Sequence, residues 1–209
     1  RQGHLRSALT YFDEAIEIDP THVRARLNRT SIHMANENAQ AALDDANVLL
    51  ELAPGLALAK LRKAEANMML SNWEEAKDDL EQIVEDAPHH HHALTQLASC
   101  FMAMDRPEKA EAPLNEALRL APEHTEAWHQ RGLLYLDWAQ EESALNDFEA
   151  AVRCDGNHLG ARLRIAAIHH KAERFSEALG AWNGVLAIEP EHTVARRRRE
   201  ECEMAIATM

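Results

Sequence analysis

The chain has 209 residues, with 35 acidic side chains against 22 basic ones and a formal net charge of −13 at pH 7. Because phosphate binding needs a basic face, this balance argues against a nucleic-acid-binding protein. No apolar run is long enough to cross a membrane, no stretch resembles a signal peptide, and three cysteines make no disulfide framework. We expect a cytoplasmic protein without a cofactor, although the chain begins within a repeat and a targeting segment could precede it.

A period of 34 residues runs through the chain without insertion or deletion. One column holds proline, with a single glycine, and two columns hold only alanine: Pro20, Pro54, Pro88, Pro122, Gly156 and Pro190; Ala8, Ala42, Ala76, Ala110, Ala144 and Ala178; Ala25, Ala59, Ala93, Ala127, Ala161 and Ala195. A fixed period of this size is typical of a repeat array, in which each unit contacts its neighbours.

The elements predicted in chain order are a half repeat, five full repeats and a final helix. The half repeat is a second helix at 1–22, and the full repeats cover 23–56, 57–90, 91–124, 125–158 and 159–192. The last helix covers 193–209 and either caps the array or continues it. Each full repeat has two apolar stripes at helical spacing, separated by a short turn and ended by the proline column. The alanine columns allow paired helices to approach closely. Larger residues fill the space beside them: Phe12, Leu80, Leu114, Phe148 and Trp182.

The repeat at 125–158 carries a known pattern most fully, at Trp128, Gly132, Tyr135, Ala144 and Phe148. This spacing resembles the tetratricopeptide repeat (TPR), which has Trp, Leu-Gly and Tyr, later Ala-x3-Phe and then Pro, at a period of 34 residues. Arg131 and Gly156 depart from it, where Leu and Pro are usual. The resemblance covers the whole chain and implies an all-α, right-handed superhelical solenoid of antiparallel helix pairs.

The departure at Arg131 recurs in two other repeats, at Arg29 and Lys63. Each of these basic residues has an aspartate sixteen residues later: Asp45, Asp79 and Asp147. The two repeats that lack the basic residue also lack the aspartate. Because a half-buried charge needs a partner, the pattern predicts three ion pairs between paired helices.

The four consecutive histidines at 89–92 follow the proline column and therefore form a connector between repeats. The slot of His90 is histidine in four other repeats, at His22, His124, His158 and His192, which indicates a packing or capping role. We predict no metal site, with chelation by the run as a minor alternative. The basic run 196–199 precedes Glu200 and Glu201, so we expect a solvated helix with internal ion pairs.

No catalytic signature is present: the sequence has no phosphate-binding glycine loop, no H-E-x-x-H pair and no G-x-S-x-G elbow. We therefore expect no enzymatic activity. The resemblance to TPR proteins implies instead that the first helix of each pair lines a groove. The predicted peptide-binding residues are Arg24, Leu27, Asn28, Ser31, Met34, Leu58, Leu61, Arg62, Glu65, Met68, Gln96, Ser99, Met102, His129, Gln130, Arg164 and His170.

The same predicted face continues over Met69, His92, Thr95, Glu126, Leu133, Leu136, Asp137, Leu163, Ala167 and Lys171. Acids and bases nearly balance on it, so the acid excess of the chain is expected elsewhere, largely on the opposite side. Met34, Met68 and Met102 share one column. They form either an adaptable binding ridge or packing between neighbouring first helices.

We therefore predict a scaffold or adaptor that binds an extended or helical peptide of another protein. Apolar side chains would contact the Met/Leu ridge, and Arg24, Arg62 or Arg164 would hold an acidic or carboxyl-terminal group. The alternatives are a non-catalytic module of a longer enzyme and a self-assembling scaffold. A minor one is similarity to carboxylate clamps for Hsp70 and Hsp90 C-termini, where Asn28 and Arg62 match and Leu58 replaces a lysine.

Overall fold

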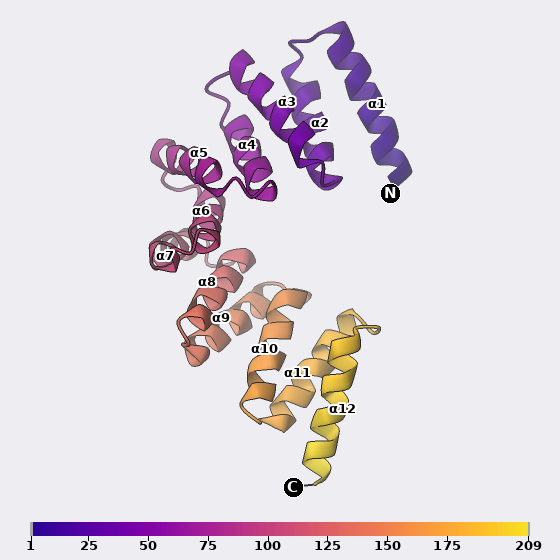
Figure 1. The fold of residues 1–209 in the computed structure, drawn as a ribbon, viewed down its shortest axis with the longest axis vertical. Coiled ribbons are helices and arrows are strands. Elements are labelled where there is room, and N and C mark those ends of the chain that lie inside the picture. Colours follow the sequence, from indigo (N-terminus) through magenta and orange to yellow (C-terminus); the bar gives the residue numbers. More distant parts are fainter. Residues whose placement is uncertain (1, 209) are drawn as a thin grey trace. The chain divides into compact units, whose positions relative to one another are not determined.

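The computed structural model describes residues 2–208, and this part of the chain forms twelve α-helices and one short 3-10 helix, with no β-strand (Figure 1). It divides into two compact units between Arg106 and Pro107. The first unit contains α1 (Gln2–Ile18), α2 (Val23–Ala35), α3 (Ala39–Leu52), α4 (Ala57–Met69), α5 (Trp73–Asp86) and α6 (His91–Ala103). The second contains η1 (Pro107–Lys109), α7 (Glu111–Leu120), α8 (Thr125–Asp137), α9 (Glu141–Cys154), α10 (Leu159–Lys171), α11 (Phe175–Ile188) and α12 (Thr193–Ala207).

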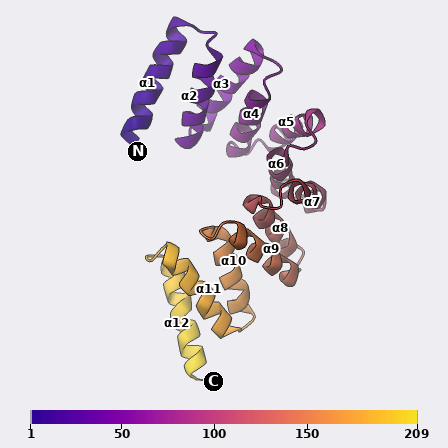
Figure 2. The same ribbon diagram turned by 180° about the vertical axis from the view of Figure 1, so that it is seen from behind.

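Within each unit, helices that follow one another in the chain pack side by side, as both views show (Figures 1 and 2). The predicted all-α solenoid is therefore confirmed. We call α2, α4, α6, α8, α10 and α12 first helices, and the other α-helices second helices. The division into a half repeat and five full repeats stays a prediction, and so does the handedness of the array.

The core of both units follows the alanine columns. Ala42, Ala76, Ala144 and Ala178 on second helices are fully buried. Beside them, two columns sixteen residues apart are buried on paired helices: Thr30 with Ala46, Ala64 with Leu80, Gly132 with Phe148, and Ala166 with Trp182. A Cβ atom on Gly132 would lie 2.7 Å from the Phe148 ring, so only glycine fits there. Small residues on one helix thus match large ones on the other, as dense packing requires.

The three predicted ion pairs between paired helices are confirmed. Arg131 donates from Nε and Nη2 to both oxygens of Asp147, at 2.7 and 2.9 Å. Arg29 holds Asp45 in the same bidentate way, at 2.7 and 2.5 Å. Lys63 reaches Asp79 with a single bond of 2.8 Å. Bidentate arginine pairs of this kind are stronger and more directional than a lysine contact.

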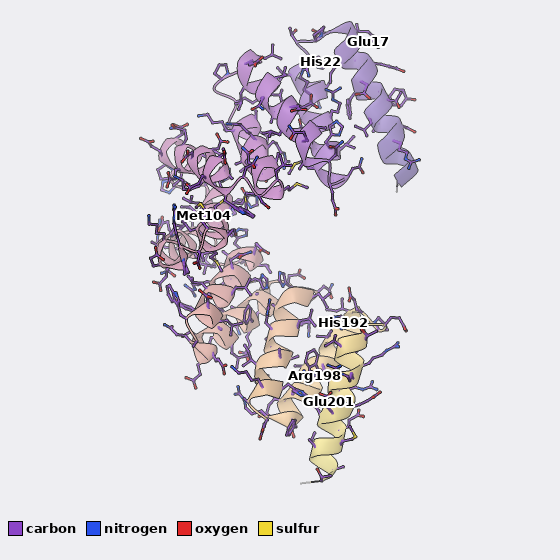
Figure 3. All side chains as sticks on the ribbon, in the orientation of Figure 1. Glu17, His22, Met104, His192, Arg198 and Glu201 are labelled. Atoms are coloured by element: carbon purple, nitrogen blue, oxygen red, sulfur yellow. The ribbon has the colours of Figure 1, made fainter. Side chains whose placement is uncertain are left out.

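The recurring histidines cap first helices. The Nδ1 atoms of His22, His90, His158 and His192 accept from the backbone N–H three residues later, at 3.0 to 3.2 Å. His22 and His192 are labelled at the starts of their helices in Figure 3. The N–H groups of a first helical turn lack partners within the helix, so this bond stabilises its start. The capping interpretation is wrong for His124, because α8 begins without a side-chain cap.

A second recurring hydrogen bond joins the start of a first helix to the connector that precedes it. The side chains of Arg26, Trp128, Arg162 and Arg196 donate to the carbonyl oxygen six residues earlier, in the proline column, at 2.7 to 3.2 Å. The tryptophan of the TPR pattern is thus one of several side chains that can bind this carbonyl. This role was not predicted from the sequence, although the four donors share one column.

One second helix differs from its counterparts. In the column that holds Ala42, Ala110 lies at the N-cap of α7, whereas Ala42 itself lies inside α3. Pro113 explains the late start, because it lacks an N–H and is tolerated only in a first turn. The segment before it, Pro107–Lys109, forms a 3-10 turn instead.

Candidate functional site

Charge separates the two classes of helix. The first helices α2 and α10 each carry three basic residues and no acidic one. The second helix α5 carries seven acidic residues and one lysine, and α3 carries three acidic residues and no basic one. The exception among first helices is α8, which has Glu126 and Asp137 against Arg131. The acid excess of the chain is thus concentrated on second helices, and the first helices offer a more basic surface.

In the first unit, the predicted groove residues differ in exposure. Arg24, Asn28, Ser31 and Leu58 are exposed, whereas Leu61 is buried and lies in the core. The remaining ones are half-buried: Leu27, Met34, Arg62, Glu65, Met68, Gln96, Ser99 and Met102. The intermediate burial of the methionines fits either a binding ridge or packing between first helices, so their role stays a prediction.

Glu65 joins two first helices of this unit. Its carboxylate accepts from Arg62 Nη1 at 2.6 Å and from Gln96 Nε2 at 3.1 Å, and His92 Nε2 lies 3.4 Å away. Burial opposes ionisation of Glu65, but the contacts with His92 and Arg62 outweigh it and keep its pKa below the usual value. Because Glu65 takes up the Arg62 guanidinium, this arginine is only partly available to a partner.

In the second unit, Glu126 and His129 of α8 approach His158, which caps α10. One ligand-type atom from each lies within 4.8 Å of the others, an arrangement that could hold a metal. The cap argues against this use. His158 Nδ1 accepts from the Ala161 N–H at 3.0 Å, so the neutral ring carries its proton on Nε2, the atom that faces Glu126 at 3.7 Å. A protonated nitrogen donates to a carboxylate and does not bind a metal.

The cluster therefore stabilises a carboxylate. His129, with Gln130 and His158, lowers the pKa of Glu126 to about 2. Gln130 donates to Glu126 at 2.6 Å, and His129 Nδ1 lies 3.8 Å from the same carboxylate. The predicted groove residues His129 and Gln130 are thus occupied by an acid of their own helix. The spacing of Glu126 and His129 can be recognised in the sequence, but the proximity of His158 to them cannot.

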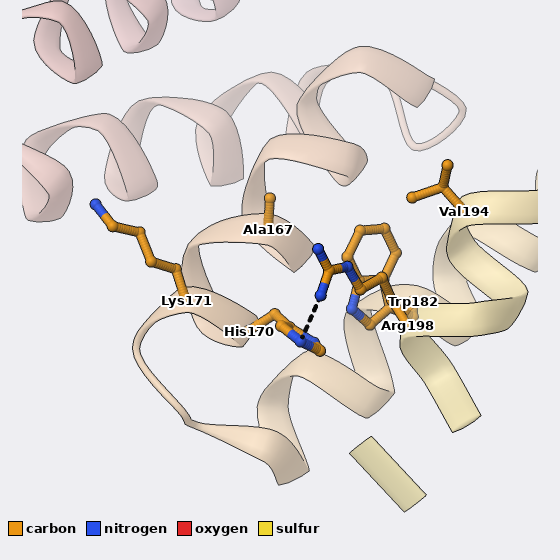
Figure 4. Close-up of a pocket in the computed structure, with 6 residues that line it drawn as sticks. All are labelled: Ala167, His170, Lys171, Trp182, Val194 and Arg198. Atoms are coloured by element: carbon orange, nitrogen blue, oxygen red, sulfur yellow. Dashed lines mark hydrogen bonds between the residues drawn. The ribbon is translucent and has the colours of Figure 1, made fainter. Parts of the chain in front are cut away.

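A large hollow lies in the second unit, among α10, α11 and α12 (Figure 4). It has a volume of about 420 Å³ and is lined by Ala167, His170, Lys171, Trp182, Val194 and Arg198. A smaller hollow of about 220 Å³ shares Ala167 and Lys171 with it, and Arg164, Leu136, Glu141 and Ile168 complete the lining. Both hollows thus lie along the first helices, and we call the larger one the α10–α12 pocket.

The side chains around the α10–α12 pocket form a connected network. Arg198 Nη1 lies 3.3 Å from His170 Nε2 and 2.8 Å from Glu201. His170 Nδ1 lies 3.3 Å from the sulfur of Cys202, which is buried and whose pKa is raised by burial. Lys171 contacts Glu141 of the neighbouring helix. Because it is buried and its pKa is raised, the Cys202 thiol is a structural group rather than a reactive one.

Trp182 forms part of the pocket lining and is only 4% exposed, and its indole N–H has no hydrogen-bond partner among the described residues. Sequence reasoning placed His170 and Arg164 on the binding face but missed Trp182, Val194 and Arg198. Trp182 was expected in the core, and the final helix was expected only to cap or continue the array. The basic run on that helix does form the expected internal ion pairs, with Glu191, Glu201 and Glu203.

No helix within residues 2–208 has both the length and the apolar character needed to span a membrane. Sequence models of the tetratricopeptide repeat match residues 1–57, 68–131 and 125–158. A comparison with curated proteins finds no match.

Several solved structures share the fold. TTC0263, a TPR protein of Thermus thermophilus, superimposes with a TM-score of 0.73 at 20% identity, covering 87% of this chain and 99% of its own. PilF of Pseudomonas aeruginosa superimposes with a TM-score of 0.76 at 18% identity, covering 89% of this chain and 87% of its own. YrrB, described as a TPR protein with an unusual peptide-binding site, superimposes with a TM-score of 0.61 at 22% identity, covering 90% of this chain and 97% of its own. The repeat matches and the shared fold together show that the chain belongs to the tetratricopeptide repeat family.

Proposed function

We propose that the chain is a non-catalytic scaffold that binds a peptide segment of another protein on its first helices. Membership in the TPR family supports a protein-interaction scaffold, since repeats of this kind commonly bind protein or peptide partners. The choice of surface rests on one observation, the separation of charge between the two classes of helix. A partner segment with acidic residues meets basic first helices and is repelled by the acidic second helices.

The proposed contacts are apolar and ionic. The exposed Leu58 and the half-buried Met68 lie on the same first helix and offer apolar surface. Arg24 and Arg164 are exposed and make no ion pair among the described residues, so they are the groove arginines most available to an acidic group. A carboxylate clamp at Asn28 and Arg62 is less favoured, because Glu65 already holds Arg62 at 2.6 Å.

The test is a selection of binding peptides on the purified chain, followed by affinity measurements with the selected peptides. The double variant Arg24→Glu, Met68→Glu places acidic groups on first helices. The control Asn47→Glu, Gln82→Glu places them at exposed positions of second helices. We expect binding to fall at least tenfold in the first variant only, with equal helix content by circular dichroism. Equal binding by both variants would refute the first-helix surface.

A further inference from the structure

We infer that the α10–α12 pocket receives a large apolar side chain of a partner's peptide, and that an acidic residue beside it pairs with Arg164. This inference rests on the proposed function and assigns a partner chemistry to one site. Two observations carry it: the apolar walls and floor of the pocket, and a rim that is basic on one side.

The walls favour an apolar side chain. Ala167 is exposed on α10, and its short side chain leaves the hollow open between α10 and α12. Trp182 and Val194 contribute further apolar surface, and Val194 is 47% exposed. A volume of about 420 Å³ lies within the usual range of roughly 300–1,000 Å³ for ligand sites. Burying an apolar side chain here removes both it and Val194 from water, which favours binding.

Trp182 provides the apolar floor of the pocket. In its column, smaller residues fill the matching space elsewhere: Ala46, Leu80 and Leu114. The indole is larger than these side chains, and its partner Ala166 is no smaller than Ala64, so the ring extends to the pocket lining. Its N–H has no acceptor among the described residues. A buried donor without a partner is costly, but the nitrogen is covered by the protein, so it is the carbon surface of the ring that a partner's side chain meets.

The rim favours an acidic neighbour, and Arg164 is the cation that it would meet. Lys171 and Arg198 already contact Glu141 and Glu201. Arg164 is exposed, has no ion pair among the described residues, and lines the smaller hollow that shares Ala167 with the pocket. The helix that carries Arg164 has no acidic residue. An extended peptide can therefore place its apolar side chain in the larger hollow and its acidic one in the smaller.

The occupant is a segment of a partner rather than a small molecule, because two adjoining hollows along α10 suit consecutive side chains of an extended chain. Recognition does not require a terminal carboxylate, since the acidic group is that of a side chain. The probe is a fluorescein-labelled peptide, Glu-Glu-Phe-Glu-Glu, with an amidated C-terminus. Its two controls replace Phe by Ala, or every Glu by Gln, and binding is read from fluorescence anisotropy.

The variants that test the site are Ala167→Leu, which fills the pocket, and Arg164→Gln, which removes the unpaired charge. Matched controls in the same unit are Ala187→Leu on α11 and Arg153→Gln on α9, both exposed and both on second helices. We expect Ala167→Leu to weaken binding at least tenfold and Arg164→Gln about threefold to tenfold. We expect the controls to bind like the parent chain, and both control peptides to bind at least tenfold more weakly than the probe.

Three results would overturn the inference. The first is no binding of the probe to the parent chain, and the second is equal binding by the parent and Ala167→Leu. The third is a parent that self-associates in sedimentation and becomes monomeric in Ala167→Leu, which would assign the pocket to a second copy. None of these alone refutes the proposed function. Peptides selected on the chain could still lose binding with Arg24→Glu, Met68→Glu, so the two failures are distinguishable.

Discussion

The helix pairs α4/α5 and α8/α9 lie in different units and fill equivalent positions with different residues. The first pair matches Ala64 with Leu80, and the second matches Gly132 with Phe148. Neither large residue leaves exposed surface, so both solutions fill the same space. The difference teaches that the residues sixteen positions apart must be considered together: where the second helix has the Phe148 ring, the first helix needs a residue without a Cβ atom.

The same comparison holds for charge. Lys63 contacts Asp79 once, and the two side chains are 29% and 19% exposed. Arg131 contacts Asp147 twice, and the two side chains are 18% and 6% exposed. Arg131 also donates to Asn115 at 2.7 Å and lies over the Trp128 ring. The Arg131–Asp147 pair is therefore less exposed to water than the Lys63–Asp79 pair, has a bidentate geometry and makes more contacts with neighbouring side chains.

Removing the aspartates is expected to have the largest effect. Asp147→Ala leaves the half-buried Arg131 without its main partner and should cost about 3 kcal/mol of unfolding free energy. Asp79→Ala should cost about 1 kcal/mol, because water reaches Lys63. Urea denaturation followed by circular dichroism measures both, and hydrogen exchange assigns each loss to its unit. Equal costs would show that exposure does not set the strength of these pairs.

The Gly132 position gives the next largest effect. Gly132→Ala places a Cβ atom within 2.7 Å of the Phe148 ring and should destabilise the second unit by about 2 kcal/mol. Adding Phe148→Leu recreates the Ala64 and Leu80 combination of α4/α5 and should restore most of the loss. The control Phe148→Leu alone leaves a cavity. A double variant no more stable than Gly132→Ala would contradict the coupling of the two columns.

Much of this framework could be predicted from the sequence, because it depends on residues that repeat. Arg131 and Asp147 were paired by comparing repeats, and the cap of His90 by its recurring slot. The side chains in the column of Trp128 also share a hydrogen bond to the proline-column carbonyl, although this role was not predicted from the sequence. Pro113 likewise accounts for the late start of α7. Each of these features is local or confined to one helix pair, so spacing alone determines which groups meet.

The candidate site could be predicted only in part, for a physical reason. A pocket depends on where side chains are missing, and the α10–α12 pocket exists because Ala167 is small while Trp182 extends to its lining. Three helices must be placed before that hollow can be recognised. The cluster of Glu126 and His158 has a similar origin, since the two residues are brought together by the stacking of successive first helices. Periodicity therefore identifies which side chains lie on the face formed by the first helices, but not where that face has a pocket.

A smaller effect concerns pH, because Glu126 occupies the position that Leu58 holds in the α4/α5 pair. The pKa of Glu126 falls from an ordinary value of 4.5 to about 2 on folding. A depressed pKa contributes stability that is full above the unfolded value and is lost as pH falls through the folded value. Since Glu126 is 47% exposed, the contribution should stay below about 1 kcal/mol.

Comparison of the parent with Glu126→Gln measures this contribution. The difference in unfolding free energy should be full near pH 5 and should disappear as pH falls from 4.5 to 2. High salt should reduce it, because solvent and ions screen an exposed carboxylate. A difference that does not change with pH would mean that His129 and His158 do not stabilise the charged form.

The smallest expected effect lies in the turns between paired helices, where Ser71 and Ala139 occupy equivalent positions with φ of 62° and 56°. This left-handed conformation is unfavourable for residues with a Cβ atom and easy for glycine. Ala139→Gly should therefore relieve strain, but it also increases the entropy of the unfolded chain. We expect a net gain of about 0.5 kcal/mol by urea denaturation, and a similar gain for Ser71→Gly, since the turn is shared by both repeats. A loss in either variant would show that the side chain at that turn makes contacts worth more than the backbone strain.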